Sequence, residues 1–212
     1  MSRFRRCDAR PSYARRWVAI DTELEQTIAA HLAAGDHAQA ATAALTGLGP
    51  QILGYIHAML RDEDAAHDVF GRFSEELWKS IGTFRAESSF KTWAYKLVMH
   101  AIGRHRRDPY VRRGRAIESA EVSGLVQDVR SRTPPFQRTE AKDQIARLRE
   151  SLDPQDQSLI FLRIDQGLSW TEVAEVVSAE GQAVDAATLR KRFERAKQRL
   201  RKLAEEAGIL DE

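Results

Sequence analysis

The residues best able to do chemistry in this chain are the bases between Ala187 and Leu203. This segment has eight bases and one acid, a formal charge of +7 (8 − 1). Its apolar residues step by four and three along one face of a predicted helix: Leu189, Phe193, Ala196, Leu200 and Leu203. The remaining face is cationic and is suited to binding phosphates and the edges of bases. A solvated basic helix or a coiled-coil segment is the alternative interpretation.

The segment before these bases predicts how they are positioned. Residues 169–177 read as a short helix, in which Ser169 and Glu172 have the spacing of a capping box. A turn over residues 178–185 follows, and then the basic helix. This is the order of a helix-turn-helix, although the turn is about five residues longer than usual. Charge is separated along the chain, because residues 139–187 have ten acids and four bases (4 − 10 = −6).

Apolar periodicity predicts an all-α fold, with two small helical domains joined by a flexible linker and a helix-turn-helix in the C-terminal one. We expect a flexible basic arm over 1–20, a helical domain over 21–107, a linker over 108–138 and the helix-turn-helix domain over 139–212. One predicted helix starts near Gly49-Pro50. Another is capped by Asp153, with Pro154 at its first position.

Composition argues against several other classes of protein. The chain has 212 residues and a single cysteine, Cys7, so an internal disulfide is impossible and a reducing cytoplasm is expected. No apolar run approaches the ~18 residues of a membrane span. The six histidines have no recognised metal spacing and there is no phosphate-binding glycine loop, so we expect neither an enzyme nor a metal or other cofactor.

Several motifs together resemble a known family. Residues 62–70 read DEDAAHDVF, Leu77-Trp78 follows, and residues 84–96 read FRAESSFKTWAYK. Leu152-Asp153-Pro154 precedes SWTEVA at 169–174. In this order and spacing, over about residues 36–204, the chain resembles bacterial sigma factors of the extracytoplasmic-function class in the sigma-70 family.

The resemblance implies a factor that binds core RNA polymerase, recognises and melts a minus-ten element with its first domain, and reads a minus-thirty-five element with its second. Core RNA polymerase, promoter DNA and an anti-sigma protein are the implied partners. The polymerase contacts would come from Asp64, Asp68, Phe70 and Trp78. The minus-ten and melting contacts would come from Arg85, Ser88, Ser89, Lys91, Arg104, Arg106 and Arg107. The minus-thirty-five contacts would come from Thr188, Arg190, Lys191, Arg192 and Arg195.

The chain departs from the family in its N-terminal extension, in its long turn, and at Gly71-Arg72, where many members have Gln-Glu. Plainer interpretations also stay open. Trp78 suits a core position, residues 84–91 suit an ordinary connection, and Arg104 to Arg107 suit a solvated helix end. Two other functions remain: a helix-turn-helix regulator acting without polymerase, and a polymerase-binding decoy that has lost promoter reading.

Overall fold

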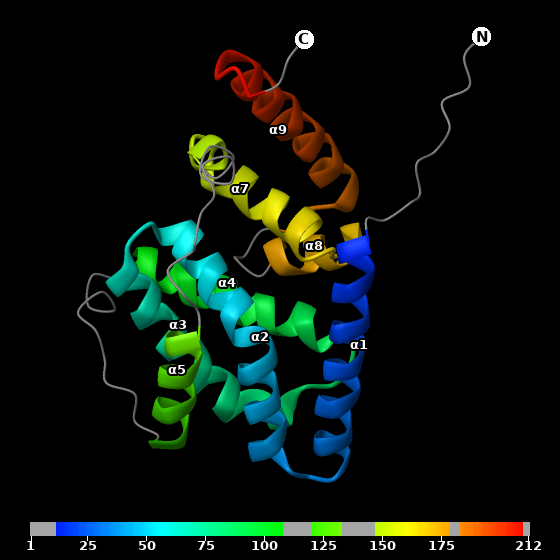
Figure 1. The fold of residues 1–212 in the computed structure, drawn as a ribbon. Coiled ribbons are helices and arrows are strands. Elements are labelled where there is room, and N and C mark those ends of the chain that lie inside the picture. The colour runs from blue at the N-terminus through cyan, green and yellow to red at the C-terminus, as the bar shows by residue number, and fades with distance from the viewer. Residues whose placement is uncertain (1–11, 108–119, 133–146, 179–182, 210–212) are drawn as a thin grey trace.

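Four long helices form the first half of the protein in the computed structural model, which describes residues 12–107, 120–132, 147–178 and 183–209, with side chains from Thr22 onward (Figure 1). They are α1 (Ser12–Ala33), α2 (His37–Leu60), α3 (Glu63–Ser80) and α4 (Phe90–Arg107), with the 3-10 turn η1 (Ile81–Thr83) before α4. The described residues contain no strand, and the all-α prediction is confirmed.

Two helix starts differ from those the sequence predicted. Helix α1 begins at Ser12, inside the segment expected to be a flexible arm. Helix α2 runs through Pro50 and begins at His37, where the Asp36 side chain caps it by accepting from the Gln39 N–H at 3.1 Å. Burial explains the second difference, because Ala40, Ala41, Ala44 and Leu45 in the first turns of α2 are buried. That packing outweighs the one helical hydrogen bond lost at the proline.

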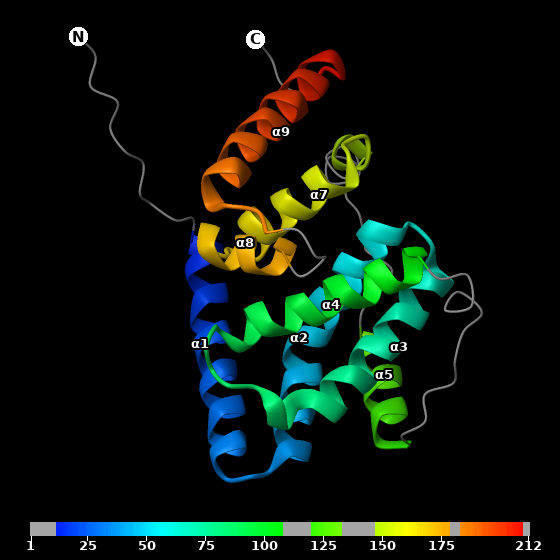
Figure 2. The ribbon, with the colours of Figure 1, turned by 180° about the vertical axis from the view of Figure 1, so that it is seen from behind.

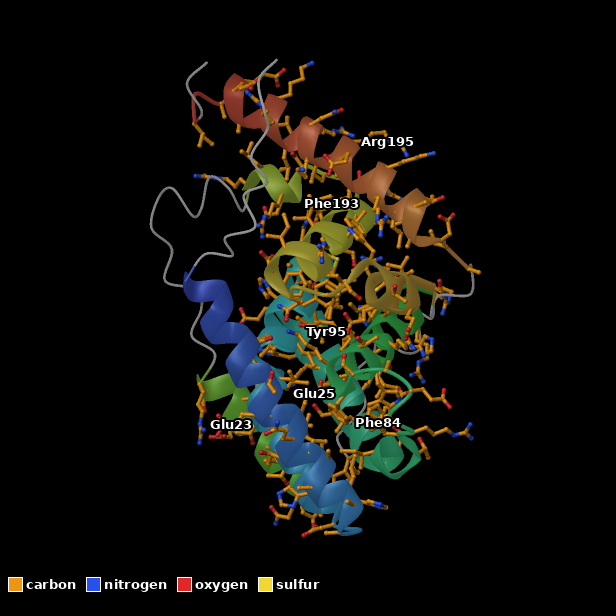
Figure 3. The ribbon with its side chains drawn as sticks, turned by 90° about the vertical axis from the view of Figure 1, so that its right-hand side faces the viewer. Glu23, Glu25, Phe84, Tyr95, Phe193 and Arg195 are labelled. Carbon is orange, nitrogen blue, oxygen red and sulfur yellow. The ribbon has the colours of Figure 1, made fainter. Side chains whose placement is uncertain are left out.

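The N-terminus of α4 is held by a side chain from α1. Both carboxylate oxygens of Glu25 accept backbone N–H groups, from Phe90 and from Lys91, each at 2.8 Å (Figure 3, where Glu25 is labelled). The first N–H groups of a helix have no partner within the helix, and a negative charge there is favourable. Glu25 therefore ties the start of α4 to the first helix.

Residues 120–132 form α5 (Ala120–Arg132), a helix that packs on α2 and α3. Val122, Val126 and Val129 are buried, and Val129 lies so close to Gly49 that a Cβ there would be 2.9 Å from its Cγ2. Arg130 donates to the His67 carbonyl at 2.7 Å. The prediction of a linker throughout 108–138 is therefore wrong for this stretch, where three valines spaced by four and three find an apolar surface.

The second half consists of α7 (Pro154–Ile160), the π-helical turn η3 (Phe161–Asp165), α8 (Trp170–Ser178) and α9 (Ala186–Glu206). The predicted cap is confirmed, since Asp153 accepts from the Gln155 N–H at 2.9 Å, with Pro154 at the first position. Gly167 ends the turn with φ 68°, a left-handed conformation that favours glycine. Trp170 meets Phe193 edge to face at 5.3 Å, which joins α8 to α9.

The two halves share one continuous apolar core. Helix α8 lies against α4, and α7 meets α2. Figures 1 and 2 show α8 between α4 and α9, with α9 farther from the first half. The second half thus packs on the first and does not hang from it as a separate body.

The packing of α5 can be tested by shortening one of its valines. We expect Val126→Ala to lower the free energy of unfolding by about 1.5–3 kcal/mol, because the lost methyl groups are buried. Gln127→Ala, at the exposed neighbouring position, is the control and should change it by less than about 0.5 kcal/mol. Urea unfolding measures both, and equal stabilities would mean that α5 does not pack on α2 and α3.

Candidate nucleic-acid interface

Helix α9 separates apolar from basic residues as its sequence predicted. Leu189, Phe193 and Ala196 are buried. Arg190, Lys191 and Arg195 are exposed, and with Glu194 they line a shallow hollow in the surface. Figure 3 labels Phe193 and Arg195 on this helix. The exposed cations are free to approach a polyanion without disturbing the contacts of the buried face.

The N-terminus of α9 is capped by Asp185, which accepts from the N–H groups of Ala187 and Thr188 at 2.8 and 2.9 Å. The Thr188 hydroxyl also donates to Asp185, at 2.6 Å. These bonds, the one from the Thr188 hydroxyl first, lower the pKa of Asp185. Thr188, which the sequence placed among the DNA contacts, thus supports the start of the helix here.

Arg192 occupies a different environment from its basic neighbours. Its guanidinium pairs with Asp153 at 2.9 Å and also bonds to Gln155 and Asp156, all at the start of α7. The side chain is one-third exposed, and it points toward α7 because it borders the buried face of α9. This arrangement does not support the prediction that Arg192 reads bases, because its guanidinium N–H groups donate to side chains of its own chain.

The first half contributes the loop before α4 and the first turns of that helix. Phe84 packs on Phe90 and Trp93, with ring centroids 5.2 and 5.5 Å apart, and so holds the loop to α4. Arg85 is exposed, while Ser88 and Ser89 are half-buried. The loop is therefore a structured element whose arginine faces solvent.

The α4–α8 seam joins Ser89, Lys91, Thr92 and Lys96 on one side to Gln166, Glu172 and Glu175 on the other. One Glu172 oxygen accepts from the hydroxyls of Ser89 and Thr92, each at 3.1 Å. Lys96 pairs with Glu175 at 2.8 Å. Lys91, expected at the DNA, is 7% exposed and donates to the Gln166 carbonyl at 3.0 Å. In this structure the Lys91 side chain faces the second half and not solvent, which corrects the expectation that its ammonium group is accessible to DNA.

Glu172 has two roles in this seam. Its other oxygen accepts from the Ser169 N–H at 2.8 Å, and its own N–H donates to the Ser169 hydroxyl at 3.3 Å, so the predicted capping box is confirmed. Burial disfavours the charged carboxylate, but the hydrogen bonds from Ser169, Thr92 and Ser89 outweigh burial and lower the pKa of Glu172. The carboxylate is charged at neutral pH and needs those donors.

The C-terminal end of α4 carries the other predicted minus-ten residues. Arg104 pairs with Glu76 of α3, and Arg106 donates to the Met59 carbonyl at 3.2 Å. Arg107 is exposed, as are the side chains of Arg104 and Arg106. The three arginines share one end of the helix and leave cationic surface at its tip.

The predicted polymerase contacts all lie on α3, but not all reach its surface. Asp64 is exposed and Asp68 is half-buried, near enough to Arg130 of α5 for their charges to interact. Phe70 is fully buried beside Phe73 and belongs to the core in this structure, so its contact with polymerase stays a prediction. Trp78 is half-buried and packs on that core, which agrees with the plainer interpretation.

Sequence reasoning missed Glu25, Thr92, Lys96 and Glu175 as residues that organise this interface. Thr92 and Lys96 lie four apart, as expected for one helical face, but nothing local marks their partners.

Among the residues that the structure describes, no group of histidine, cysteine or acidic side chains is placed to hold a metal ion. None of the described helices is both long and apolar enough to cross a membrane.

An all-helical protein whose last helix exposes a row of cations fits the class of nucleic-acid-binding proteins. Residues 45–110 match the family described as Sigma-70 region 2. RNA polymerase sigma-H factor of Pseudomonas aeruginosa is 25% identical over 162 residues, covering 72% of this chain and 79% of that protein. RNA polymerase sigma factor YlaC of Bacillus subtilis is 28% identical over 165 residues, covering 75% and 91%.

The fold also matches a solved structure, that of CnrH in complex with the cytosolic domain of CnrY. The match has a TM-score of 0.57 and 17% identity, and covers 86% of this chain and 98% of CnrH. Residues 45–110 thus carry a Sigma-70 region 2 domain, and over 72–75% of its length the chain is similar to RNA polymerase sigma factors of the extracytoplasmic-function type. These similarities support a sigma factor that directs transcription initiation.

The contrast between Arg192 and Arg195 can be tested without DNA. We expect Arg192→Ala to lower the free energy of unfolding by about 1 kcal/mol, a value reduced for the partial exposure of its ion pairs. Arg195→Ala, on the exposed face, should leave it within about 0.5 kcal/mol of the parent. Denaturant titration of both variants measures the difference, and a larger loss for Arg195→Ala would contradict the structural role given to Arg192.

Proposed function

We propose that the two halves of this sigma factor divide promoter recognition, the first half recognising and melting the minus-ten element and the second reading the minus-thirty-five element. The observation that carries the proposal is the exposed basic face of α9, which follows the capped helix α8 in the order of a helix-turn-helix. Recognition helices usually contact base edges with their N-terminal residues.

For the second half, Arg190, Lys191 and Arg195 are the proposed readers of base edges. All three are exposed within the first turns of α9. Arginine can donate two hydrogen bonds to one guanine, which discriminates against other bases by roughly 1–3 kcal/mol. Lys197, Arg199, Arg201 and Lys202 lie farther along and would meet phosphates.

For the first half, the proposed minus-ten surface runs from the loop before α4 to the tip of that helix. Arg85, Arg104, Arg106 and Arg107 are its exposed cations. Unpaired bases in a melted promoter can be stacked and hydrogen-bonded by such a surface. Ser88 and Ser89 belong to it by the family resemblance, although Glu172 of α8 contacts Ser89 in this structure. Lys91 donates instead to the Gln166 carbonyl.

The proposed partners are core RNA polymerase, promoter DNA and an anti-sigma protein, all meeting the chain in the cytoplasm. The exposed Asp64 at the start of α3 is the proposed polymerase contact, with Asp68 behind it. The likeness in fold to CnrH, whose structure contains a bound domain of CnrY, supports a protein partner of that kind.

Promoter reading is tested by binding of the reconstituted holoenzyme to a randomised upstream element at several salt concentrations. We expect Arg190→Ala to change which sequences are preferred, because a base contact is lost. Lys202→Ala is the control and should weaken all sequences alike, lowering the salt slope by about one unit, or do nothing. If both variants keep the parental preference, α9 is not the reader, and transcription without any promoter preference would favour the polymerase-binding decoy.

Polymerase docking is tested by reversing one exposed charge. We expect Asp64→Arg to weaken binding to core RNA polymerase by about three- to tenfold, the size expected for an exposed charge at an interface rim. Glu23→Arg makes the same change of charge on the exposed face of α1 and should have no effect. Affinities are measured by titration with labelled core enzyme, after checking that both variants melt normally. Equal affinities would place the docking surface elsewhere.

A further inference from the structure

Helix α5 packs beside two of the predicted polymerase contacts, and the first of them is Phe70. Val129 of α5 lies on Gly49 of α2, where a Cβ would be 2.9 Å from Cγ2 of Val129 and 3.4 Å from Cζ of Phe70. Val129 and the Phe70 ring are therefore neighbours beside this glycine. Figures 1 and 2 show α5 against α2 and α3, far from α9. Without α5, the groove beside Phe70 would be open.

Asp68 is the second predicted contact beside α5. Arg130 of α5 donates to the backbone carbonyl of His67 at 2.7 Å, and its charge interacts with that of the adjacent Asp68 carboxylate. Asp68 is half-buried, whereas Asp64, one turn earlier on α3, is exposed. Asp68 thus faces a cation of its own chain, where a cation of the polymerase would have to lie in order to pair with it.

The properties of α5 suit an occupant that can leave its groove. It has 13 residues, about the length at which an isolated helix is marginal in water, and Gly124 weakens it further. Its helical state therefore depends on the apolar side chains that it packs on α2 and α3: Val122, Leu125, Val126 and Val129. The fit is incomplete, because Nε of Arg130 is buried without a hydrogen-bond partner among the residues that the structure describes.

We propose that α5 is an internal competitor of core RNA polymerase: it occupies the groove beside Asp68 and Phe70 and must leave before the polymerase binds there. The proposal rests on the assignment of the docking surface to α3 given above. What α5 supplies to the groove defines what the polymerase must supply in its place, namely apolar side chains and a cation for Asp68. Phe70, buried in this structure, becomes a direct contact once α5 has left.

Competition of this kind lowers the apparent affinity for polymerase without abolishing it. Only the fraction of molecules with α5 released can bind, so the apparent dissociation constant is the intrinsic constant divided by that fraction. Substitutions that weaken the docking of α5 therefore tighten polymerase binding, although they destabilise the protein. A purely structural α5 predicts the opposite, because a less stable fold leaves binding unchanged or weakens it.

Release of α5 is tested by titrating labelled core RNA polymerase with paired variants of this helix. We expect Arg130→Ala and Val126→Ala to tighten binding by about three- to tenfold, because each removes a contact that holds α5 in place. Arg132→Ala and Gln127→Ala, at exposed positions of the same helix, are the matched controls and should leave the affinity unchanged. Weaker or unchanged binding by both release variants overturns the proposal.

A reversible lock tests the same competition with one protein as its own control. In a Cys7→Ser background, Gly49→Cys and Val129→Cys place two thiols across the α2–α5 contact, with their Cβ atoms within the roughly 3.5–4.5 Å that a disulfide requires. We expect the oxidised protein to bind core RNA polymerase at least about tenfold more weakly than the same protein after reduction. The Cys7→Ser parent, treated in the same way, controls for effects on the polymerase. Equal affinities, with the disulfide verified by thiol titration, overturn the proposal.

Departure of α5 is observed directly by hydrogen exchange. We expect the backbone amides of residues 120–132 to exchange at least about tenfold faster in the complex with core RNA polymerase than in the free protein, because the helix loses the groove that stabilises it. The amides of α2 serve as the internal reference. Protection of α5 that persists in the complex contradicts the proposal.

Asp64→Arg distinguishes failure of this inference from failure of the proposed docking surface. Asp64 is already exposed, so its contact with polymerase does not depend on release of α5. If Asp64→Arg leaves polymerase binding unchanged, the docking surface proposed on α3 fails, and this inference fails with it. If Asp64→Arg weakens binding but the lock does not, the polymerase docks on α3 with α5 in place, and only this inference fails.

Discussion

The carboxylate of Glu25 at the N-terminus of α4 is the interaction on which the rest of the structure depends. It satisfies two backbone N–H groups that the helix itself cannot satisfy. Because α4 packs on α2 and α3 with one face and receives α8 on another, its position sets the position of both halves. The aromatic loop of Phe84 is placed by the same helix.

The helices that the sequence predicted are those with strong local signals. Apolar periodicity predicted the helical domain over 21–107, which contains α3 and α4. Asp153-Pro154 and the Ser169–Glu172 box predicted the starts of α7 and α8. The first turns of α2 and all of α5 were missed because tertiary contact stabilises them. Pro50 was interpreted as the start of a helix that in fact begins at His37. The three valines of α5 lie among polar residues and were assigned to a linker, because the sequence does not show that Gly49 leaves room for Val129.

The features of the candidate interface also differ in whether local sequence could predict them. The basic face of α9 follows from helical periodicity, which is a local property. The roles of Arg192 and Lys91 depend on acceptors 39 and 75 residues away in the chain, Asp153 and the Gln166 carbonyl. Periodicity distinguishes a buried face from an exposed one, but it does not say which exposed cation finds an acceptor within its own chain.

The docking of α5 also sets how far the two halves can travel. With α5 packed on α2 and α3, only residues 133–146 separate Arg132 from Arg147, a stretch that spans at most about 50 Å when fully extended. If α5 undocked and unwound, the whole of residues 108–146 would become tether, with a reach of about 130 Å. The three buried valines thus shorten the stretch of chain that links the two halves, and undocking of α5 would increase the greatest distance between the two proposed DNA-binding surfaces.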